Sequence, residues 1–331
     1  MEPKRYKFTI VLLVSCLFLG LGAAFFLSAG FHQFLGKEIA VIDDAKVIEK
    51  QSPPLRPISA EQRLKVAVGA MISPKNTAVY YSQLLSYLGR SLGMEVELVQ
   101  RKTYAEINTL LISGDIHIAF ICSGPYAIDV SQQGLSPLAT PIVQGKHLYH
   151  SYLIVKNDCG YSKLEDLRGK SFAFTDPDSN TGSIVPRYWL AKAGTDAKEY
   201  FSNIIFTYSH DNSILAVGKG LVDGAAVDSL IWDYYASKDS DFTGKTRIIK
   251  RSEGYGIPPV VASSRLPEEQ RKRLQATLLS MHKTPEGAAI LKELLIDRFV
   301  VPQEDWYSSI REMHSFLNIT ETVNDATPKK P

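Results

Sequence analysis

Two short runs of small polar residues have the composition of anion-binding helix starts. Residues 179–183 (SNTGS) follow an expected strand that ends at Phe174, and they open a helix beginning near Ile184. A helix N-terminus presents unpaired N–H groups and the positive end of the helix dipole, and Ser and Thr hydroxyls add uncharged donors. Helix capping alone explains one Ser or Thr, but this run has four small polar side chains and a glycine. We therefore expect this run to hold an oxyanion.

The second run, residues 121–126 (ICSGPY), likewise ends an expected strand and begins a helix in another part of the chain. In α/β proteins, ligands bind beyond the carboxyl ends of the strands. Two helix starts that face each other across a cleft would hold an anion from both sides. The pattern predicts binding by hydroxyls, backbone amides and helix dipoles, without covalent chemistry.

No motif for catalysis or metal binding is complete in the sequence. Gly169 resembles the end of a P-loop, but the glycine required five residues earlier is Leu164. The acidic run that starts at Asp176 lacks the glycine and the final carboxylate of a calcium loop. His147 and His150 are three residues apart on an expected strand and therefore point to opposite faces. Since no nucleophile motif accompanies the acid and base groups, the sequence predicts a protein that is not an enzyme and uses neither a metal nor a cofactor.

The charge balance argues against nucleic acid as the main partner. Of the 331 residues, 37 are Lys or Arg and 35 are Asp or Glu, a net charge of +2 at pH 7. Residues 1–31 contain three basic residues and one acidic residue, so the remainder of the chain is neutral. Nucleic-acid binding needs clustered Lys and Arg. Hydrophobic residues at 45% and charged residues at 22% indicate a globular body.

Residues 1–31 have the features of a signal peptide or a membrane anchor. Basic residues precede residues 8–31, which carry no charge and are rich in Leu, Phe, Val, Ala and Gly. This length favours an uncleaved anchor, since about 20 apolar residues cross a bilayer and a cleaved signal has only about 7 to 15. The small residues at 28–30 leave cleavage open, and residues 13–16 resemble a lipoprotein box. In each case the remainder is expected on the periplasmic or extracytoplasmic face, tethered to the membrane if residues 8–31 are retained.

Two further segments lie outside the expected folded body. Residues 32–63 are polar, contain several prolines and show no sustained period, which predicts a flexible spacer. Residues 318–331 are polar and end in Pro-Lys-Lys-Pro, which predicts a disordered tail.

Between these segments, short apolar runs alternate with amphipathic ones. Strands are expected at residues 64–69, 95–100, 116–121, 171–174, 204–208 and 225–227, and helices at 76–92, 103–112, 184–193, 213–219 and 231–237. This alternation predicts an α/β fold with mostly parallel sheets covered by helices on both faces. A long strand at 147–156 joins the two sets, and a helical segment at 267–316 is expected to pack back onto the first. We therefore expect two lobes, with residues 64–155 and 253–317 in lobe 1 and residues 156–252 in lobe 2.

Four longer motifs give the chain a resemblance to a known family. They are Asp176-Pro177-x-Ser179-x-Thr181-Gly182, Val185-Pro186-Arg187, Ser209-His210-Asp211 and Val222-Asp223-Gly224-Ala225-Ala226-Val227-Asp228. With them, residues 64–316 resemble the phosphonate, phosphite and phosphate substrate-binding proteins of ABC transporters. The resemblance implies the type 2 periplasmic-binding-protein fold, in which two lobes joined by two crossovers close on the ligand by a hinge. It also implies capture of a small phosphorus oxyanion for an ABC permease.

The resemblance assigns the contacts with the oxyanion to both lobes. The implied contacts are Tyr81 and Tyr126 from lobe 1, and Ser179, Thr181, Gly182, Ser183 and His210 from lobe 2. Ser123 in the second helix start and Asp211, directly after the histidine, are further candidate contacts. His210 is expected to donate a hydrogen bond to an oxygen of the ligand, with a capping or core role as the alternative. The alternative for Tyr81 is a core aromatic residue.

Two departures from the family bear on the ligand. Relatives that bind aminoalkyl phosphonates hold the ammonium group with two carboxylates; here one is the shorter Asp211 and the other is Pro258. We therefore expect that 2-aminoethylphosphonate is not the ligand. The second departure is Cys122, where an aromatic residue is common. Cys122 is expected to be a buried small hydrophobe or else a ligand for arsenite, which would make the chain a membrane-anchored receptor that signals to a sensor kinase. A bridge from Cys122 to Cys159 is the one intramolecular disulfide open to the chain, because Cys16 lies in the apolar segment.

Overall fold

The computed structural model describes residues 63–135 and 137–326. The expected signal or anchor, the spacer up to residue 62 and residues 327–331 lie outside the described residues. Within the described part of the chain, no helix combines the length and the apolar character needed to cross a membrane.

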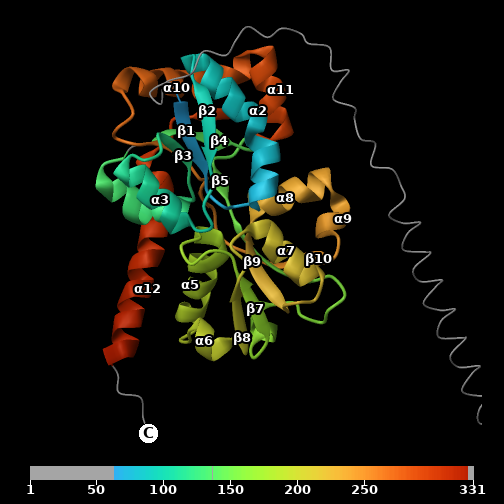
Figure 1. The fold of residues 1–331 in the computed structure, drawn as a ribbon. Helices are drawn as coiled ribbons and strands as arrows, with labels where there is room; N and C mark the ends of the chain where they lie inside the picture. The colour runs from blue at the N-terminus through green and yellow to red at the C-terminus, as the bar shows by residue number, and fades with distance from the viewer. Residues whose placement is uncertain (1–62, 136, 327–331) are drawn as a thin grey trace, which may run out of the picture. The chain divides into compact units, whose positions relative to one another are not determined.

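Lobe 1 is built on a six-stranded sheet with the strand order β13-β4-β12-β3-β1-β2 (Figure 1). Its strands are β1 (Arg63–Val68), β2 (Glu95–Val99), β3 (Ile118–Phe120), β4 (Pro137–Ile142), β12 (Val260–Ala262) and β13 (Arg298–Val300). The expected parallel pairing is confirmed for β2, β1 and β3. The strands β12, β4 and β13 pair antiparallel, which the alternation of strands and helices does not reveal.

Both faces of this sheet are covered because successive side chains of a strand point to opposite sides. On β1, Leu64, Val66 and Val68 contact one apolar cluster, and Ala67 contacts the other. The first cluster is closed by α2 (Pro74–Leu92), α10 (Glu268–Ser280) and α11 (Pro285–Glu293). The second is closed by α3 (Tyr104–Ser113), η3 (Tyr126–Val130) and α12 (Ser308–Ala326).

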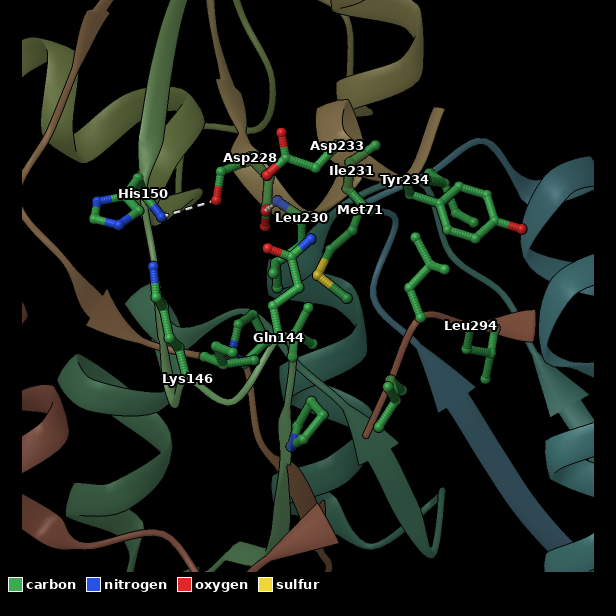
Figure 2. A pocket seen from close by; sticks show the side chains of 18 of the residues that line it. Met71, Gln144, Lys146, His150, Asp228, Leu230, Ile231, Asp233, Tyr234 and Leu294 are labelled. Carbon is green, nitrogen blue, oxygen red and sulfur yellow. Dashed lines mark hydrogen bonds between the residues drawn. The ribbon is translucent and has the colours of Figure 1, made fainter. Parts of the chain in front are cut away.

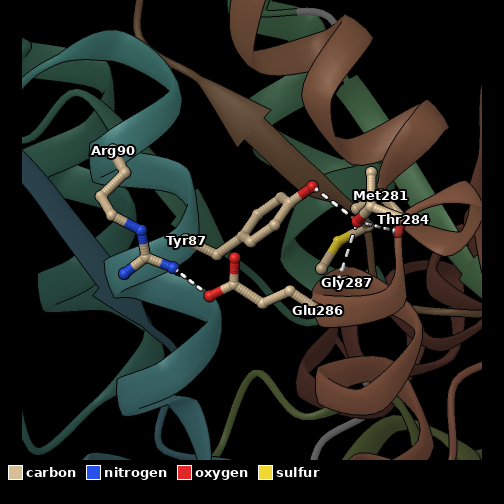
Figure 3. Close-up of polar contacts among 6 residues, drawn as sticks. All are labelled: Tyr87, Arg90, Met281, Thr284, Glu286 and Gly287. Carbon is tan, nitrogen blue, oxygen red and sulfur yellow. Dashed lines mark hydrogen bonds and ion pairs between the residues drawn. The ribbon is translucent and has the colours of Figure 1, made fainter.

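The helices α2 and α11 are fixed to each other by polar contacts at the surface (Figure 3). The side chain of Thr284 begins α11 by accepting the N–H of Gly287 at 3.0 Å, and the Tyr87 hydroxyl of α2 lies 3.1 Å from the same oxygen. Arg90 of α2 also forms an ion pair with Glu286 of α11. Exposed ion pairs contribute little stability, so the shared apolar cluster beneath carries most of this packing.

Lobe 2 has a five-stranded sheet with the strand order β10-β6-β9-β7-β8. Its strands are β6 (Ser151–Lys156), β7 (Ser171–Phe174), β8 (Asn203–Phe206), β9 (Gly224–Asp228) and β10 (Thr246–Arg251). Here β7 pairs parallel with β8 and with β9, whereas β6 pairs antiparallel with β9 and with β10. One face is covered by α5 (Val185–Lys192) and α6 (Ala197–Tyr200), and the other by α7 (His210–Gly218), α8 (Ser229–Lys238) and α9 (Ser240–Thr243).

Two crossovers join the lobes, and they pair with each other. The strand β5 (Leu148–Tyr149) runs antiparallel to β11 (Tyr255–Gly256). The long strand expected at 147–156 is interrupted at His150, because the backbone N–H of His150 bonds the Ser229 hydroxyl at 3.0 Å and its carbonyl accepts the N–H of Ser229. The residues after this break, including β6, belong to the sheet of lobe 2, so the expected boundary at residue 155 lies about five residues too late.

The last helix, α12, corrects two expectations about the C-terminal segment. A disordered tail from residue 318 is wrong, since α12 continues to Ala326. Its buried side chains Ile310, Met313 and Leu317 recur at helical spacing, and no proline interrupts the sequence before Pro328. The helix also packs on more than lobe 1.

The contacts of α12 extend to both lobes. It packs on η3 of lobe 1 and on α5 of lobe 2, and in Figure 1 it runs alongside α5. The ring of Tyr188 on α5 meets Phe316 edge-on, with 5.3 Å between the ring centres. The C-terminal helix is therefore a third connection between the lobes, besides the two crossovers.

Candidate functional site

The expected anion-binding helix start lies at the carboxyl end of β7 and is fully buried. It begins with a π-helical turn, η6 (Asn180–Ile184), which continues into α5. The Ser179 hydroxyl caps this turn by accepting the N–H of Gly182 at 3.1 Å. The side chains of Thr181 and Ser183 are 0% and 2% exposed. Small polar residues therefore occur here in the interior, where a polar group needs a partner.

Gly182 is required at its position by the closeness of its neighbours. A Cβ atom at residue 182 would lie 1.6 Å from Thr175 Oγ1, 2.8 Å from Thr175 Cβ and 3.1 Å from His210 Cε1. The absence of a side chain brings the end of β7, the start of η6 and the start of α7 into contact. Three segments that can donate hydrogen bonds thus meet at one place.

His210 is the first residue of α7 and is an uncharged donor. Its Nδ1 accepts the backbone N–H of Asp228 at 3.1 Å, which leaves the ring proton on Nε2. Burial lowers the pKa of His210 to about 3, although the nearby carboxylate of Asp211 acts in the opposite direction. The imidazole is therefore neutral at physiological pH. The preceding Tyr208 has a φ of 58°, uncommon outside glycine, and this turn directs the start of α7 towards η6.

Four buried hydroxyl groups around these helix starts have no hydrogen-bond partner among the described residues. They are the hydroxyls of Tyr104, Thr175, Thr181 and Ser209. The amide oxygen of Asn180 is also unpartnered. Buried polar groups without a partner are uncommon and costly in folded proteins. Hydroxyls that both donate and rotate are suited to the oxygens of an anion, so their concentration here points to a ligand.

The start of the second run contacts the first directly. Cys122 Sγ accepts the N–H of Asn180 at 3.5 Å, across the two lobes. The Ser123 hydroxyl lies 2.6 Å from the Tyr149 hydroxyl of the crossover, which also accepts from Asn180 Nδ2 at 3.2 Å. The two predicted helix starts therefore face each other. Ser123 acts through Tyr149 to hold Asn180, so we assign it a positioning role instead of direct contact.

Cys122 and Cys159 are both free, so the disulfide considered from the sequence does not form. Cys122 follows β3 of lobe 1, whereas Cys159 follows β6 of lobe 2. Burial raises the pKa of the Cys122 thiol to about 12, against the lowering effect of nearby backbone donors. A thiol that stays protonated fits a small buried hydrophobe and disfavours the thiolate that an arsenite receptor needs.

Asp211 lies between the lobes and is occupied by lobe 1. Its two oxygens accept the N–H of Ser73 at 3.0 and 3.1 Å, and Asn76 Nδ2 donates to Oδ2 at 3.1 Å. These donors begin α2. In the same way Asp176 of lobe 2 accepts the N–H of Tyr104 at the start of α3, at 3.1 Å. Two carboxylates of lobe 2 therefore cap helices of lobe 1, and the structure gives Asp211 this role instead of the expected ligand contact.

The two tyrosines expected from lobe 1 have different positions. Tyr81 is half-buried, meets Phe120 edge-on at 5.4 Å and lines a cavity. Burial raises its pKa to about 12, and Asp228 adds to the effect. Tyr126 instead packs edge-on against Tyr307 at 4.8 Å in the core of lobe 1. The structure does not bring Tyr126 to the unpartnered hydroxyls, so we remove it from the candidate contacts.

Asp228 is a central residue that the sequence reasoning did not assign to the site. It ends β9, is 2% exposed, and its carboxylate accepts the N–H of Leu230 at 2.7 Å. Burial raises its pKa to about 7. Its charge acts on Tyr81, Tyr104 and Cys122, raising the pKa of each. Asp228 therefore lies among the site residues of both lobes.

A cavity of about 480 Å³ adjoins this cluster (Figure 2). Its walls come from both lobes, and Figure 2 shows Asp228, Asp233 and Leu230 on the lobe 2 side with Met71 beside them. Within the described ranges, no group of three or more His, Cys, Asp or Glu side chains is arranged to hold a metal ion.

Four residues of the site were missed from the sequence, and weak signals existed for each. They are Tyr104, Thr175, Ser209 and Asp228. Ser209 and Asp228 fall inside two of the motifs that carry the resemblance, and Thr175 directly follows an expected strand. Tyr104 follows the capping residue Thr103, so its position at a helix start was visible. What the sequence does not show is that these starts meet.

Two lobes joined by paired crossovers, with helix starts converging on hydroxyls that lack partners among the described residues, define a hinged ligand-binding protein. Comparison with known proteins supplies the family. Residues 66–307 match the family model described as "ABC transporter, phosphonate, periplasmic substrate-binding protein". The chain therefore belongs to this family of periplasmic substrate-binding proteins.

Individual relatives agree with this assignment. The chain is 29% identical over 186 residues to the phosphate-import protein PhnD of Mycolicibacterium smegmatis, covering 52% of this chain and 57% of that one. It is 26% identical over 250 residues to the phosphonates-binding periplasmic protein of Escherichia coli, covering 72% and 73%. The match thus spans little more than half of the first relative and about three quarters of the second.

Solved structures confirm the type 2 periplasmic-binding-protein fold. A binding protein of a Pseudomonas aeruginosa phosphonate transporter superposes with a TM-score of 0.75 at 22% identity, covering 81% of this chain and 90% of that one. PhnD1 of Prochlorococcus marinus, in complex with methylphosphonate, gives a TM-score of 0.69 at 20% identity, covering 78% and 98%.

Proposed function

We propose that the chain captures a small phosphorus oxyanion (phosphonate, phosphite or phosphate) between its lobes and performs no chemistry on it. The observation that carries this proposal is the set of unpartnered buried hydroxyls of Tyr104, Thr175, Thr181 and Ser209. The family and the printed names of its relatives supply the chemical class of the ligand.

The proposed mechanism is closure around an anion that is held by uncharged donors. The hydroxyls and the Nε2 proton of His210 donate, and the helix dipoles favour the negative charge. The amides of Gly182 and Ser183, expected to contact the anion, instead bond the side chain and the carbonyl of Ser179. Hydrogen bonds to a charged group are each worth about 1.5 to 3 kcal/mol, so several together hold a desolvated anion without Lys or Arg. The caps from Asp176 and Asp211 stabilise the closed arrangement.

The occupied state of Asp211 supports the expectation that 2-aminoethylphosphonate is not the ligand. Its oxygens are taken by Ser73 and Asn76 of lobe 1. Pro258, where relatives have the second carboxylate, lines the cavity and offers no charge. An ammonium group would lack the pair of carboxylates that those relatives use.

Delivery to an ABC permease outside the cytoplasm completes the proposal. Residues 8–31 would tether the chain to the membrane, and residues 32–63 would connect this tether to the folded body. The folded body would then stay close to a permease in the same membrane. The alternative role, a receptor for a sensor kinase, has no observation in its favour.

A thermal-shift screen of the full chain tests the proposal. Phosphate, phosphite, methylphosphonate and sulfate are compared, and a ligand at 100 times its Kd should raise the unfolding free energy by about 2.7 kcal/mol. Thr181→Ala should weaken binding of the best ligand ten- to hundredfold, whereas Thr277→Ala, at a half-buried position of α10 in lobe 1, should leave it unchanged. Stabilisation by none of the phosphorus oxyanions would refute the proposed function.

A further inference from the structure

The cavity in Figure 2 shares residues with the proposed anion site. The side chain of Met71 belongs to a small buried cluster with Tyr104 and Cys122, and Met71 also lines the cavity. Its carbonyl accepts the N–H of His210 at 2.9 Å. Asp228 lies on the same boundary. Met71 and Asp228 therefore form the boundary between the anion site and the cavity.

Two other sides of the anion site are filled by hydrogen-bonded groups. On the side of α3, Asp176 bonds the N–H of Tyr104. On the side of the crossover, the hydroxyls of Ser123 and Tyr149 contact each other and Asn180. The cavity is the space into which a substituent on the ligand can extend.

The size of the cavity exceeds what a small oxyanion needs. Its volume of about 480 Å³ falls in the range of roughly 300 to 1,000 Å³ that is usual for pockets holding drug-sized ligands. A methyl group or a hydrogen on phosphorus would leave most of this space empty.

The walls are mainly apolar and aromatic. The aromatic residues that line the cavity are Tyr80, Tyr81, Phe120, Tyr152, Tyr234 and Phe299. Aliphatic walls come from α8 and from the segment after α11, where Figure 2 shows Leu230, Ile231 and Leu294. Such surfaces favour burial of apolar groups at about 25 cal/mol per Å².

The charged side chains of the cavity are exposed or already partnered. Lys146 and Arg251 are exposed. Arg251 lies over the ring of Tyr152 at 4.6 Å, and the Tyr152 hydroxyl donates to Asp233 at 3.2 Å. Asp228 accepts a backbone N–H from its own helix. Asp228 and Asp233 thus each have a hydrogen-bond partner, and Lys146 and Arg251 extend towards solvent.

We propose that the cavity binds the organic substituent of the ligand, so that the preferred ligand is a phosphonate or phosphate monoester with one bulky, uncharged and predominantly apolar substituent. This inference rests on the proposed function, because the phosphoryl group must occupy the anion site for its substituent to reach the cavity.

The test is a calorimetric titration of the full chain with phosphate and with alkylphosphonates from methyl to hexyl. Each methylene that enters the cavity should tighten binding about fourfold, which corresponds to about 0.8 kcal/mol per buried methylene. Ala236→Trp, which fills the cavity from α8, should abolish this gain with chain length and keep methylphosphonate binding. Ser237→Trp, the neighbouring exposed position of α8, is the matched control and should keep both.

The outcomes separate this inference from the function on which it rests. If methylphosphonate binds and longer chains bind equally or more weakly, the inference is wrong and the proposed function stands. If the gain with chain length persists in Ala236→Trp, the substituent lies elsewhere and the inference is also wrong. If neither phosphate nor any alkylphosphonate binds, and phosphite gives no stabilisation in the thermal-shift screen, the proposed function itself fails.

Discussion

Replacing Gly182 by Ala tests the convergence of the helix starts most directly. A Cβ there would lie 1.6 Å from Thr175 Oγ1 and 2.8 Å from Thr175 Cβ. Rotation of the hydroxyl relieves the first contact, but relief of the second requires a backbone shift. Overpacking costs up to about 3 kcal/mol, and Ala gains about 1 kcal/mol over Gly in a helix. We expect the unfolding free energy to fall by about 2 kcal/mol.

The effect of Gly182→Ala on ligand binding should be larger than its effect on stability. The shift displaces both the Thr175 hydroxyl and the His210 ring, and two lost hydrogen bonds to a charged ligand amount to at least about 3 kcal/mol. Calorimetric titration with methylphosphonate should therefore show an affinity more than a hundredfold lower. Thermal unfolding of the unliganded variant measures the stability.

Two companion variants make this experiment decisive. Gly160→Ala adds a methyl group where nothing lies within 4 Å, so it should change neither stability nor affinity. Adding Thr175→Gly to Gly182→Ala removes the Cβ atom that the new methyl group meets at 2.8 Å, so it should restore part of the stability but not the affinity, since the hydroxyl is gone. If Gly182→Ala alone binds within threefold of the original chain, the three segments do not form the site.

Three further outcomes are expected. Asp211→Asn should weaken ligand binding about tenfold, because it removes the charge that caps α2 from the opposite lobe. Asp196 caps α6 within lobe 2, so the control variant Asp196→Asn should leave binding unchanged. Calorimetry compares the two variants, and equal effects on affinity would contradict the proposed role of Asp211. His210 has a pKa below that of a free histidine, so its contribution to stability falls as the pH decreases from about 6.5 towards 3. Asp228 has a pKa above that of a free aspartate, so its contribution to stability falls as the pH increases from about 4 towards 7. The unfolding free energy is measured by denaturant titration between pH 4.5 and 6.5. On acidification, His210→Gln should gain stability relative to the original chain and Asp228→Asn should lose it, each by about 1.4 kcal/mol per pH unit. Parallel pH profiles for the original chain and the variants would show that the two groups do not titrate as stated. Cys122 should stay unlabelled by a thiol reagent in the folded chain and become labelled on denaturation, as read by mass spectrometry; rapid labelling of native protein would contradict its burial.

Much of the fold and part of the site follow from local sequence patterns. The parallel strands were predictable because each is a short apolar run followed by an amphipathic helix. The strands β4, β12 and β13 were not, since they pair antiparallel with partners far away in the sequence. The start of α7 at His210 was placed three residues too late, because His210 and Asp211 resemble loop residues until their distant partners are known.

The candidate site was also predicted only where its features are local in the sequence. The polar composition of residues 179–183 marked a helix start that holds an anion, because caps and hydroxyls are local features. The roles of Asp211, Ser123 and Tyr126 depend on which side chains of the other lobe or of the core they meet. The spacing of residues along one sequence does not reveal such long-range contacts. For this reason the types of residue in the site were predicted better than the role of each residue.

The position of α12 has a consequence for how the molecule opens. Rotation about the paired crossovers β5 and β11 moves lobe 2 as a body, and α12 is anchored in lobe 1 while it packs on α5 of lobe 2. Opening must therefore slide or separate the α5 and α12 surfaces, including the rings of Tyr188 and Phe316. The free energy of the apolar contact between α12 and α5 therefore adds to the cost of opening the lobes.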